Sequence, residues 1–148
     1  VIPTPTSGVT SPLQATAEPL PAVLHRTLGE GWDPRLGLEA VFDLVVAANR
    51  FVEDTKPWAL ARAEGGGDVD AGQRLDRVLW SLTECLRLGA EALRPFLPET
   101  ADRIATQLGV TLAANWTQGL QWGALSAGGQ VAAPVPLFPK REPPRESA

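Results

Sequence analysis

The chain has 148 residues, which is enough for one domain with a buried core. Its hydrophobic fraction of 44% and charged fraction of 20% are typical of a globular protein, and its formal net charge of -4 excludes bulk electrostatic binding of nucleic acid, because such binding needs clustered Lys and Arg. A single cysteine excludes an internal disulfide, and one cysteine with one histidine are too few for a closed zinc site.

No stretch of about 18 apolar residues could cross a bilayer, and the first residues lack the basic and then apolar order of a signal peptide. We therefore expect a cytoplasmic protein with neither membrane nor DNA as a partner. The sequence also contains no methionine, so we expect a piece of a longer protein or a processed product.

The first part of the chain predicts a linker and then a helix. Residues 1–12, "VIPTPTSGVTSP", combine Pro, Thr, Ser and Gly without a period, and we expect a linker from a missing upstream part. A helical pattern follows in "PLPAVLHRTLGEG", with leucines at four-residue spacing, Pro21 in the first turn and Gly29 or Gly31 as the stop.

A second helix is predicted from Pro34 to about Asp54. Asp33 is a good N-cap residue, and Pro34 fits the first helical position. Apolar residues at helical spacing predict that one side of this helix packs against the core. They are Leu38, Val41, Phe42, Val45 and Val52.

Two further helices follow a glycine-rich turn. The third is the strongest in the chain: it begins near Asp70, and Pro95 closes it. Its apolar positions recur at three and four residues; they are Leu75, Val78, Leu79, Leu82, Leu86, Ala90 and Leu93. The fourth helix opens at Pro98 and stops at Gly109.

After Gly109 the helical period is weak, and we expect an irregular segment that packs across the helices with Trp116 and Trp122. The fold class predicted is all-α, a helical bundle of about four helices with an irregular C-terminal segment. The bundle should occupy residues 13–142, and residues 143–148 should be a disordered tail.

No catalytic or metal-binding constellation is present: the sequence lacks a phosphate-binding Gly-Lys loop, a nucleophile elbow and a helical histidine pair. The lone His25 is predicted to be a surface or packing residue. Cys85, next to Leu86 in the third helix, is predicted to be a buried, unreactive thiol. We therefore expect no catalytic residue, no metal ligand and no cofactor in these residues.

Trp58 differs from the other tryptophans because it follows a proline at the end of a charged helix. Pro57 disfavours helical geometry at Lys56 and turns the chain, which carries the indole out at a helix terminus. An exposed indole can stack on a nucleobase for about 1 to 3 kcal/mol, and simple packing is an equally open explanation. Glu53 and Asp54 point about 100° apart on the helix and predict a solvated face.

The stretches "ANRFVEDTKPWALA", "LDRVLWSLTECLRLGAEALRPFLPETADRI" and "PVPLFPKRE" together resemble the C-terminal anticodon-binding domain of bacterial methionyl-tRNA synthetases, from about residue 12 to 142. The resemblance implies that Trp58, directed by Pro57, stacks on an anticodon base, the cytosine of CAU. It implies that Glu53 is the acidic side chain that takes part in binding the anticodon, with Asp54 as the second choice. Asn49 and Arg50 match the same helix motif, and a structural role in joining the helix to its neighbours is favoured for Asn49.

The resemblance further implies that the intact enzyme attaches methionine to tRNA(Met) with ATP and Mg²⁺. These residues would bind the tRNA anticodon loop without catalysing, because the family's catalytic domain and the helix that opens its anticodon-binding domain, which carries an Asn and an Arg, are both missing here. The partners implied are tRNA(Met) and that upstream catalytic domain. Two alternatives stay open: the corresponding domain of a class I synthetase for leucine, isoleucine, valine or cysteine, and a helical protein-interaction module.

Overall fold

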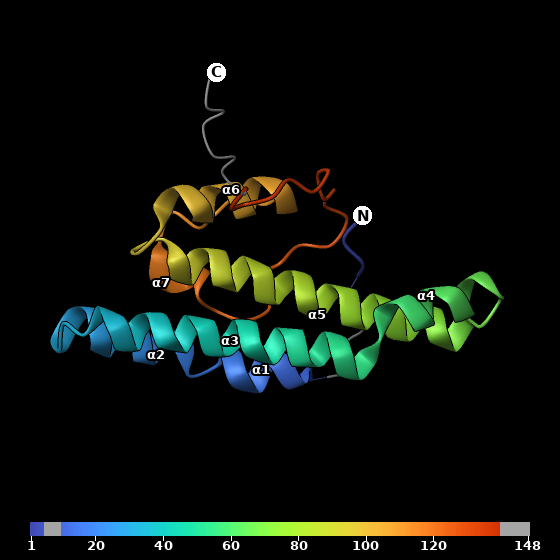
Figure 1. Cartoon of the computed structure of the whole chain (residues 1–148), viewed down its shortest axis with the longest axis horizontal. Helices are drawn as coiled ribbons and strands as arrows, with labels where there is room; N and C mark the ends of the chain where they lie inside the picture. Colours follow the sequence, from blue (N-terminus) through green and yellow to red (C-terminus); the bar gives the residue numbers. More distant parts are fainter. Residues whose placement is uncertain (5–9, 140–148) are drawn as a thin grey trace, which may run out of the picture.

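The computed structural model describes residues 1–4 and 10–139, and within them all regular structure is helical (Figure 1). The expected all-α class is therefore confirmed. The tail expected at 143–148, part of the linker expected at 1–12 and the end of the "PVPLFPKRE" motif lie outside the described residues. In chain order the elements are α1 (Pro12–Ala17), α2 (Leu20–His25), the π-helical turn η1 (Arg26–Glu30), α3 (Pro34–Thr55), α4 (Pro57–Gly65), α5 (Val69–Leu93), α6 (Pro98–Leu108) and α7 (Trp116–Gly119).

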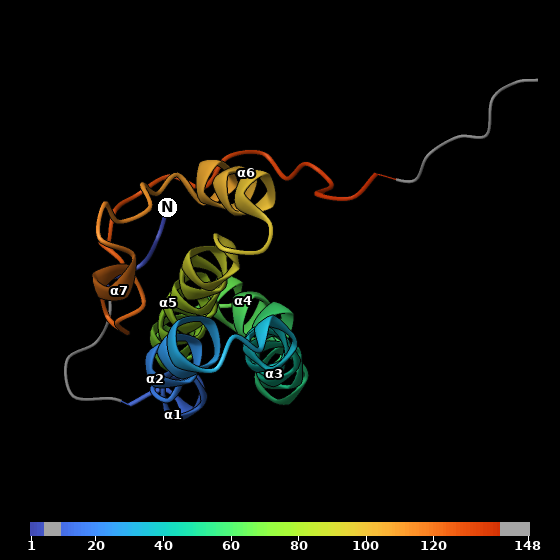
Figure 2. The same cartoon turned by 90° about the vertical axis from the view of Figure 1, so that its left-hand side faces the viewer.

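Helix α5 is the centre of the molecule. It runs antiparallel to α3 and contacts α1, α3, α4, α6 and α7. Figure 2 shows α6 on the side of α5 away from α1 and α2, with α7 on a further side. In the part of the chain that the structure describes, no helix combines the length and the apolar character needed to cross a membrane.

The predicted helix boundaries are confirmed where proline, aspartate and glycine mark them. The Asp33 carboxylate accepts a hydrogen bond from the Leu36 N–H at 3.1 Å, which caps the start of α3. The Asp68 carboxylate caps α5 in the same way, through the Ala71 N–H at 2.9 Å. Gly109 ends α6 in the left-handed conformation, with φ of 67°.

Three helices were not predicted: α1, α4 and the short α7, which lies within the segment expected to be irregular. Residues 12–17 form α1, and Pro19, which has no N–H to donate, separates it from α2. Pro57 likewise starts another helix, α4, directly after α3 ends.

The first residues of the chain contact its C-terminal segment. Ile2 is only 2% exposed, and its N–H donates to the Gly129 carbonyl at 2.7 Å. Ile2 therefore packs against the C-terminal segment.

The prediction that α3 packs with one apolar stripe is only half right. Of the predicted residues, Val41 is buried and Leu38 and Val52 are partly buried, whereas Phe42 is 55% exposed and Val45 is also exposed. Leu44, which was not in the predicted stripe, is buried. The cause is that α1, α2 and α5 cover only one side of α3, so apolar residues on its other side stay in contact with solvent. The same holds for α5, where Leu86 is 51% exposed.

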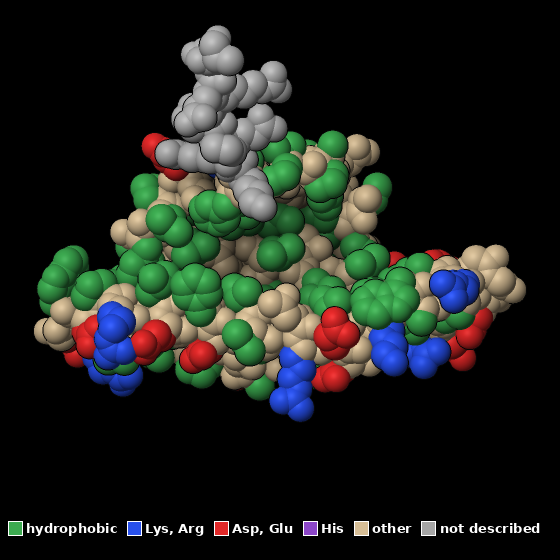
Figure 3. All heavy atoms as spheres, in the orientation of Figure 1, with side chains coloured by type: hydrophobic (Ala, Val, Ile, Leu, Met, Phe, Trp, Pro, Cys, Tyr) green, Lys and Arg blue, Asp and Glu red, His purple; other side chains and the backbone are tan. Residues whose placement is uncertain are grey.

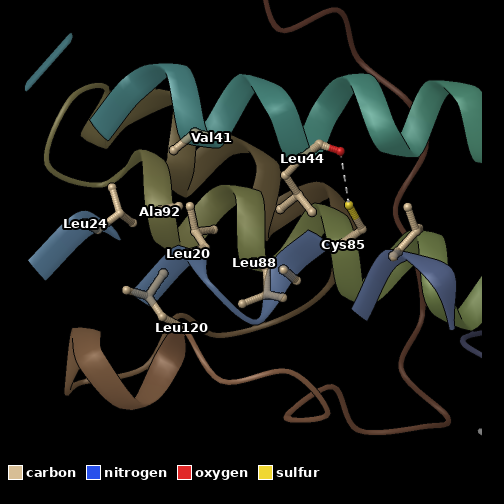
Figure 4. Close-up of a cluster of buried hydrophobic side chains, with 10 residues drawn as sticks. Leu20, Leu24, Val41, Leu44, Cys85, Leu88, Ala92 and Leu120 are labelled. Atoms are coloured by element: carbon tan, nitrogen blue, oxygen red, sulfur yellow. Dashed lines mark hydrogen bonds between the residues drawn. The ribbon is translucent and has the colours of Figure 1, made fainter. Parts of the chain in front are cut away.

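The core lies where α1, α2, α3 and α5 meet (Figure 4). The Cys85 thiol lies there and donates a hydrogen bond of 3.9 Å to the Leu44 carbonyl. Leu120, from the segment that follows α7, closes the cluster. The labelled side chains of this core are Leu20, Leu24, Val41, Leu44, Cys85, Leu88, Ala92 and Leu120.

Two ion pairs, whose glutamates are buried on α5, hold the irregular C-terminal segment. Glu84 and Arg87 pair at 2.7 Å, and the Glu84 carboxylate also accepts from the Gly123 N–H at 2.6 Å. The Arg87 guanidinium donates to the carbonyls of Gly119 and Gln121, at 2.7 and 2.8 Å. Nearly every charge-bearing atom of the pair therefore has a partner, which offsets the cost of burying it.

The second pair, Glu91 and Arg94 at 3.0 Å, lies two turns further along α5. The Glu91 carboxylate accepts from the Ala113 N–H at 2.6 Å, and Arg94 donates to the Ala113 carbonyl at 2.7 Å. The Trp116 indole N–H donates to the Glu91 carbonyl at 2.7 Å. The expected packing of this segment across the helices, with Trp116 and Trp122 half-buried against the core, is confirmed.

Candidate functional site at the α3–α4 junction

The chain changes direction at Lys56, between α3 and α4. Lys56 adopts φ 47° and ψ 63°, in the left-handed region that non-glycine residues seldom occupy. Pro57 disfavours right-handed helical geometry at the residue before it, so α3 does not continue through Lys56. The Lys56 N–H still caps α3 by donating to the Val52 carbonyl at 2.9 Å.

The same residue begins α4. Its carbonyl accepts from the Ala59 N–H at 2.8 Å and from the Leu60 N–H at 3.3 Å. Pro57 occupies the first position of α4, where a missing N–H has no cost and φ is already suited to a helix. The junction is therefore a fixed turn between two helices, with its hydrogen bonds satisfied from both sides.

Trp58 is the second residue of α4 and is 52% exposed. Because it lies one residue from the fixed turn, its backbone position is determined by Lys56 and Pro57. An indole that is half in contact with the protein and half in solvent can receive a flat ring on its open side. The role implied for Trp58 in stacking stays a prediction.

Four other predicted site residues lie exposed on the last turns of α3. The Arg50 guanidinium lies 3.8 Å from the Asp54 carboxylate, one turn away. Glu53 and Asn49 are also one turn apart, and they lie on the strip of α3 next to that of Arg50 and Asp54. Within the described ranges Glu53 forms no ion pair, whereas Asp54 is engaged by Arg50. Of the two acids, Glu53 is therefore the more available to a ligand.

The structural role favoured for Asn49 stays a prediction. Its side chain is exposed and makes no hydrogen bond within the described part of the chain. Asn49 therefore lies exposed on α3, one turn before the exposed Glu53.

Exposed apolar side chains extend from this site along α3 and α5. Figure 3 shows hydrophobic side chains gathered on the face of the molecule that bears these two helices. We use the term α3–α5 apolar face for Phe42, Val45, Leu79 and Leu86, all of which are exposed. The sequence pattern could not separate them from the core, because both sets recur at helical spacing.

The two side chains considered for catalysis, His25 and Cys85, lie in different helices, α2 and α5. His25 is exposed near Glu30 at the far end of α2. Burial, and secondly the nearby Glu84, raise the pKa of the Cys85 thiol from 9.0 to about 12, so it stays protonated. Among the residues described, no three of His, Cys, Asp and Glu form a group that could hold a metal ion.

Sequence reasoning missed the buried polar residues Glu84, Arg87 and Glu91. A signal for them exists, because Glu-x-x-Arg occurs twice at seven-residue spacing, in "ECLR" and "EALR". Residues that are seven positions apart lie on the same side of a helix, and here that side contacts the C-terminal segment.

No family model matches the chain. It is 37% identical over 103 residues to a methionine–tRNA ligase of Clostridium acetobutylicum, a match that spans 70% of this chain and 15% of that protein. It is 33% identical over 127 residues to the Streptomyces coelicolor methionine–tRNA ligase, which spans 82% of this chain and 23% of that protein. The chain thus spans less than a quarter of the length of these relatives.

The fold is likewise similar to that of solved methionyl-tRNA synthetase structures. The structure of Mycobacterium tuberculosis methionyl-tRNA synthetase bound by methionyl-adenylate superposes with a TM-score of 0.81 and 25% identity, over 93% of this chain and 27% of that one. The apo form of the same synthetase superposes with a TM-score of 0.78 and 25% identity, over 97% of this chain and 28% of that one.

Proposed function

This chain is homologous to methionine–tRNA ligases over most of its length, and we propose that it is the anticodon-binding domain of such an enzyme. The intact enzyme would attach methionine to tRNA(Met) in the cytoplasm, using ATP and Mg²⁺, and this domain would bind the anticodon loop without catalysing. The observation that carries the proposal is the half-exposed Trp58 indole on a turn fixed by Lys56 and Pro57.

Stacking is the interaction that the Trp58 indole is suited to make. A base on an aromatic ring contributes about 1 to 3 kcal/mol, whatever the net charge of the protein. The chain has a net charge of -4, so affinity from the phosphate backbone alone would be low. We therefore expect stacking on this indole to contribute more to the affinity than contacts with the phosphate backbone do.

Stacking does not distinguish one base from another, and a hydrogen-bonding group must supply the choice. The Glu53 carboxylate accepts hydrogen bonds only, which suits the amino group of cytosine and rejects the carbonyl of uracil. Asn49, one turn before it, adds an amide that can both donate and accept. Glu53 and Asn49 are thus proposed to select the base, and Trp58 to hold it.

The upstream catalytic domain is the proposed protein partner. The α3–α5 apolar face lies in solvent in this chain, and exposed apolar patches of this kind are typical of an interface. The relatives are four to seven times as long as the matched region, given the 23% and 15% of their lengths that it spans. We propose that part of that additional length covers the face.

The proposal is tested by Trp58→Ala in the intact enzyme. We expect charging of tRNA(Met) to fall by about tenfold to a hundredfold, the equivalent of one stacking interaction. Activation of methionine with ATP should be unchanged, because the catalytic domain does not use the indole. Trp32→Ala is the matched control, since Trp32 is 74% exposed at the other end of α3. Equal losses of activation and charging in Trp58→Ala would contradict the proposal.

A second candidate function, a helical protein-interaction module, is favoured by the α3–α5 apolar face alone. Binding of the intact enzyme to tRNA with a CAU anticodon and to tRNAs with changed anticodons separates the two. Preference for CAU supports the methionine-specific proposal. Preference for a leucine, isoleucine, valine or cysteine anticodon would assign the domain to another class I synthetase, and no preference would favour the interaction module.

A further inference from the structure

A cavity of about 410 Å³ lies between the end of α3, helix α4 and the first half of α5. Phe51 lines it from α3, Leu60 from α4 and Trp80 from α5. Its volume falls within the range of about 300 to 1,000 Å³ that is usual for small-molecule sites. Trp58 does not line it, so the cavity is a separate feature from the proposed anticodon site.

Three aromatic side chains contribute to its wall. Trp80 and Trp122 contact each other edge to face, with ring centroids 6.0 Å apart and planes at 79°. Both line the cavity, together with Phe51. Trp80 is fixed because it is buried in a small core cluster with Ile2 and Leu125. A planar ring in the cavity would therefore meet rigid aromatic surfaces.

Two arginines from one side of α5 also line the cavity. Arg74 and Arg77 are three residues apart, which places them next to each other on the helix surface. Neither forms an ion pair within the described ranges. Asp68 and Asp70 share an adjacent hollow with both arginines, yet no carboxylate oxygen comes within 4 Å of either guanidinium there.

The opposing charge in the cavity itself is Asp54. Its carboxylate lies 3.8 Å from the Arg50 guanidinium on the outer side of α3. The two arginines outnumber the one carboxylate among the residues that line the cavity, so the lining carries a net positive formal charge. Arginine donates two parallel hydrogen bonds to a phosphate, and two neighbouring arginines suit a phosphate group well.

We propose that this cavity binds one nucleotide unit, with its base against the tryptophan and phenylalanine rings and its phosphate on Arg74 and Arg77. The nucleotide is either a free mononucleotide or one residue of an RNA strand, since both present the same base and phosphate. This site shares neither Trp58 nor Glu53 with the proposed anticodon site, although Asp54, the second choice for the acidic role there, lines the cavity.

The test is a titration of the full chain with AMP, followed by tryptophan fluorescence, because Trp80 and Trp122 both line the cavity. AMP should bind at least about tenfold more tightly than adenosine or inorganic phosphate, since only AMP uses both parts of the site. Arg74→Gln and Arg77→Gln should each weaken AMP binding about tenfold. Arg26→Gln is the matched control, because Arg26 is exposed and lies at the far end of the molecule.

A short single-stranded RNA distinguishes the two sources. If RNA is the natural ligand, the oligonucleotide competes with AMP, and Arg74→Gln weakens its binding in a Trp58→Ala background. If a free nucleotide is the ligand, AMP binds and the oligonucleotide does not compete.

No saturable binding of AMP, or equal weakening by Arg26→Gln, overturns the proposal. Trp58→Ala should leave AMP affinity unchanged, so failure here and failure of the anticodon proposal are separate results.

Discussion

Glu84 and Arg87, one turn apart on α5, form a buried ion pair that also binds the backbone of the segment after α7. Glu84 is fully buried, and its carboxylate accepts from Arg87 and from the Gly123 N–H. Arg87 completes the network through the Gly119 and Gln121 carbonyls. The pair therefore connects the central helix to an irregular segment that has few backbone hydrogen bonds of its own.

Breaking this pair should destabilise the chain strongly. Arg87→Ala leaves the Glu84 carboxylate buried without its partner, and we expect the free energy of unfolding to fall by about 3 to 5 kcal/mol. Urea denaturation followed by circular dichroism measures it. Arg35→Ala is the control, because the Arg35–Glu39 pair is exposed and should contribute at most about 1 kcal/mol. Equal effects of the two changes would show that the buried network is not important for stability.

Gly119→Ala and Gly89→Ala should act in opposite directions. A Cβ on Gly119 would lie 2.5 Å from the Glu91 carboxyl carbon, so we expect a loss of about 1 to 3 kcal/mol. A Cβ on Gly89, within α5, meets nothing within 4 Å. Alanine there should stabilise the helix by about 0.5 to 1 kcal/mol. Thermal unfolding of both variants checks the signs, and destabilisation by Gly89→Ala would contradict the packing described here.

Lys56 should tolerate glycine better than a branched residue. Glycine adopts the left-handed conformation without strain, so Lys56→Gly should leave stability unchanged or slightly raised. Lys56→Val should lower it by about 1 to 3 kcal/mol, because a β-branched side chain is strained there. Chemical denaturation of the two variants provides the comparison. Equal stabilities would mean that the turn does not depend on the left-handed conformation.

Glu53→Gln should reduce discrimination between anticodons in the intact enzyme. A carboxylate that accepts from the cytosine amino group discriminates by about 1 to 3 kcal/mol, so we expect about a tenfold loss of preference for CAU over a uracil-containing variant. Charging rates of the two tRNAs measure it. Asp54→Asn is the matched control, because Asp54 is adjacent and engaged by Arg50. A larger effect of Asp54→Asn would reassign the role to Asp54.

The Cys85 thiol makes stability depend on pH in the alkaline range. Its pKa is raised by burial, and secondly by Glu84, from 9.0 to about 12. The unfolded chain releases this proton first, so its contribution to stability is complete below pH 9 and is lost as the pH rises toward 12. Cys85→Ala should lose stability less steeply between pH 9 and 11. Parallel slopes for the two proteins would show that the thiol does not titrate differently in the folded state.

Local sequence signals determined much of this molecule. Asp33 with Pro34 predicted the start of α3, Pro98 and Gly109 predicted the bounds of α6, and Pro57 predicted the turn that exposes Trp58. These signals succeed because capping and proline geometry act within about one turn of the residue concerned.

Only the tertiary structure decided which apolar and charged residues are buried. Phe42 and Leu44 look alike in the sequence, yet one is exposed and the other is in the core, because a partner helix covers one side of α3. Burial of Glu84 and Arg87 likewise depends on a segment more than thirty residues away, through Gly119 and Gly123. Periodicity identifies a helix and its faces, and only packing between distant elements determines which face is removed from water.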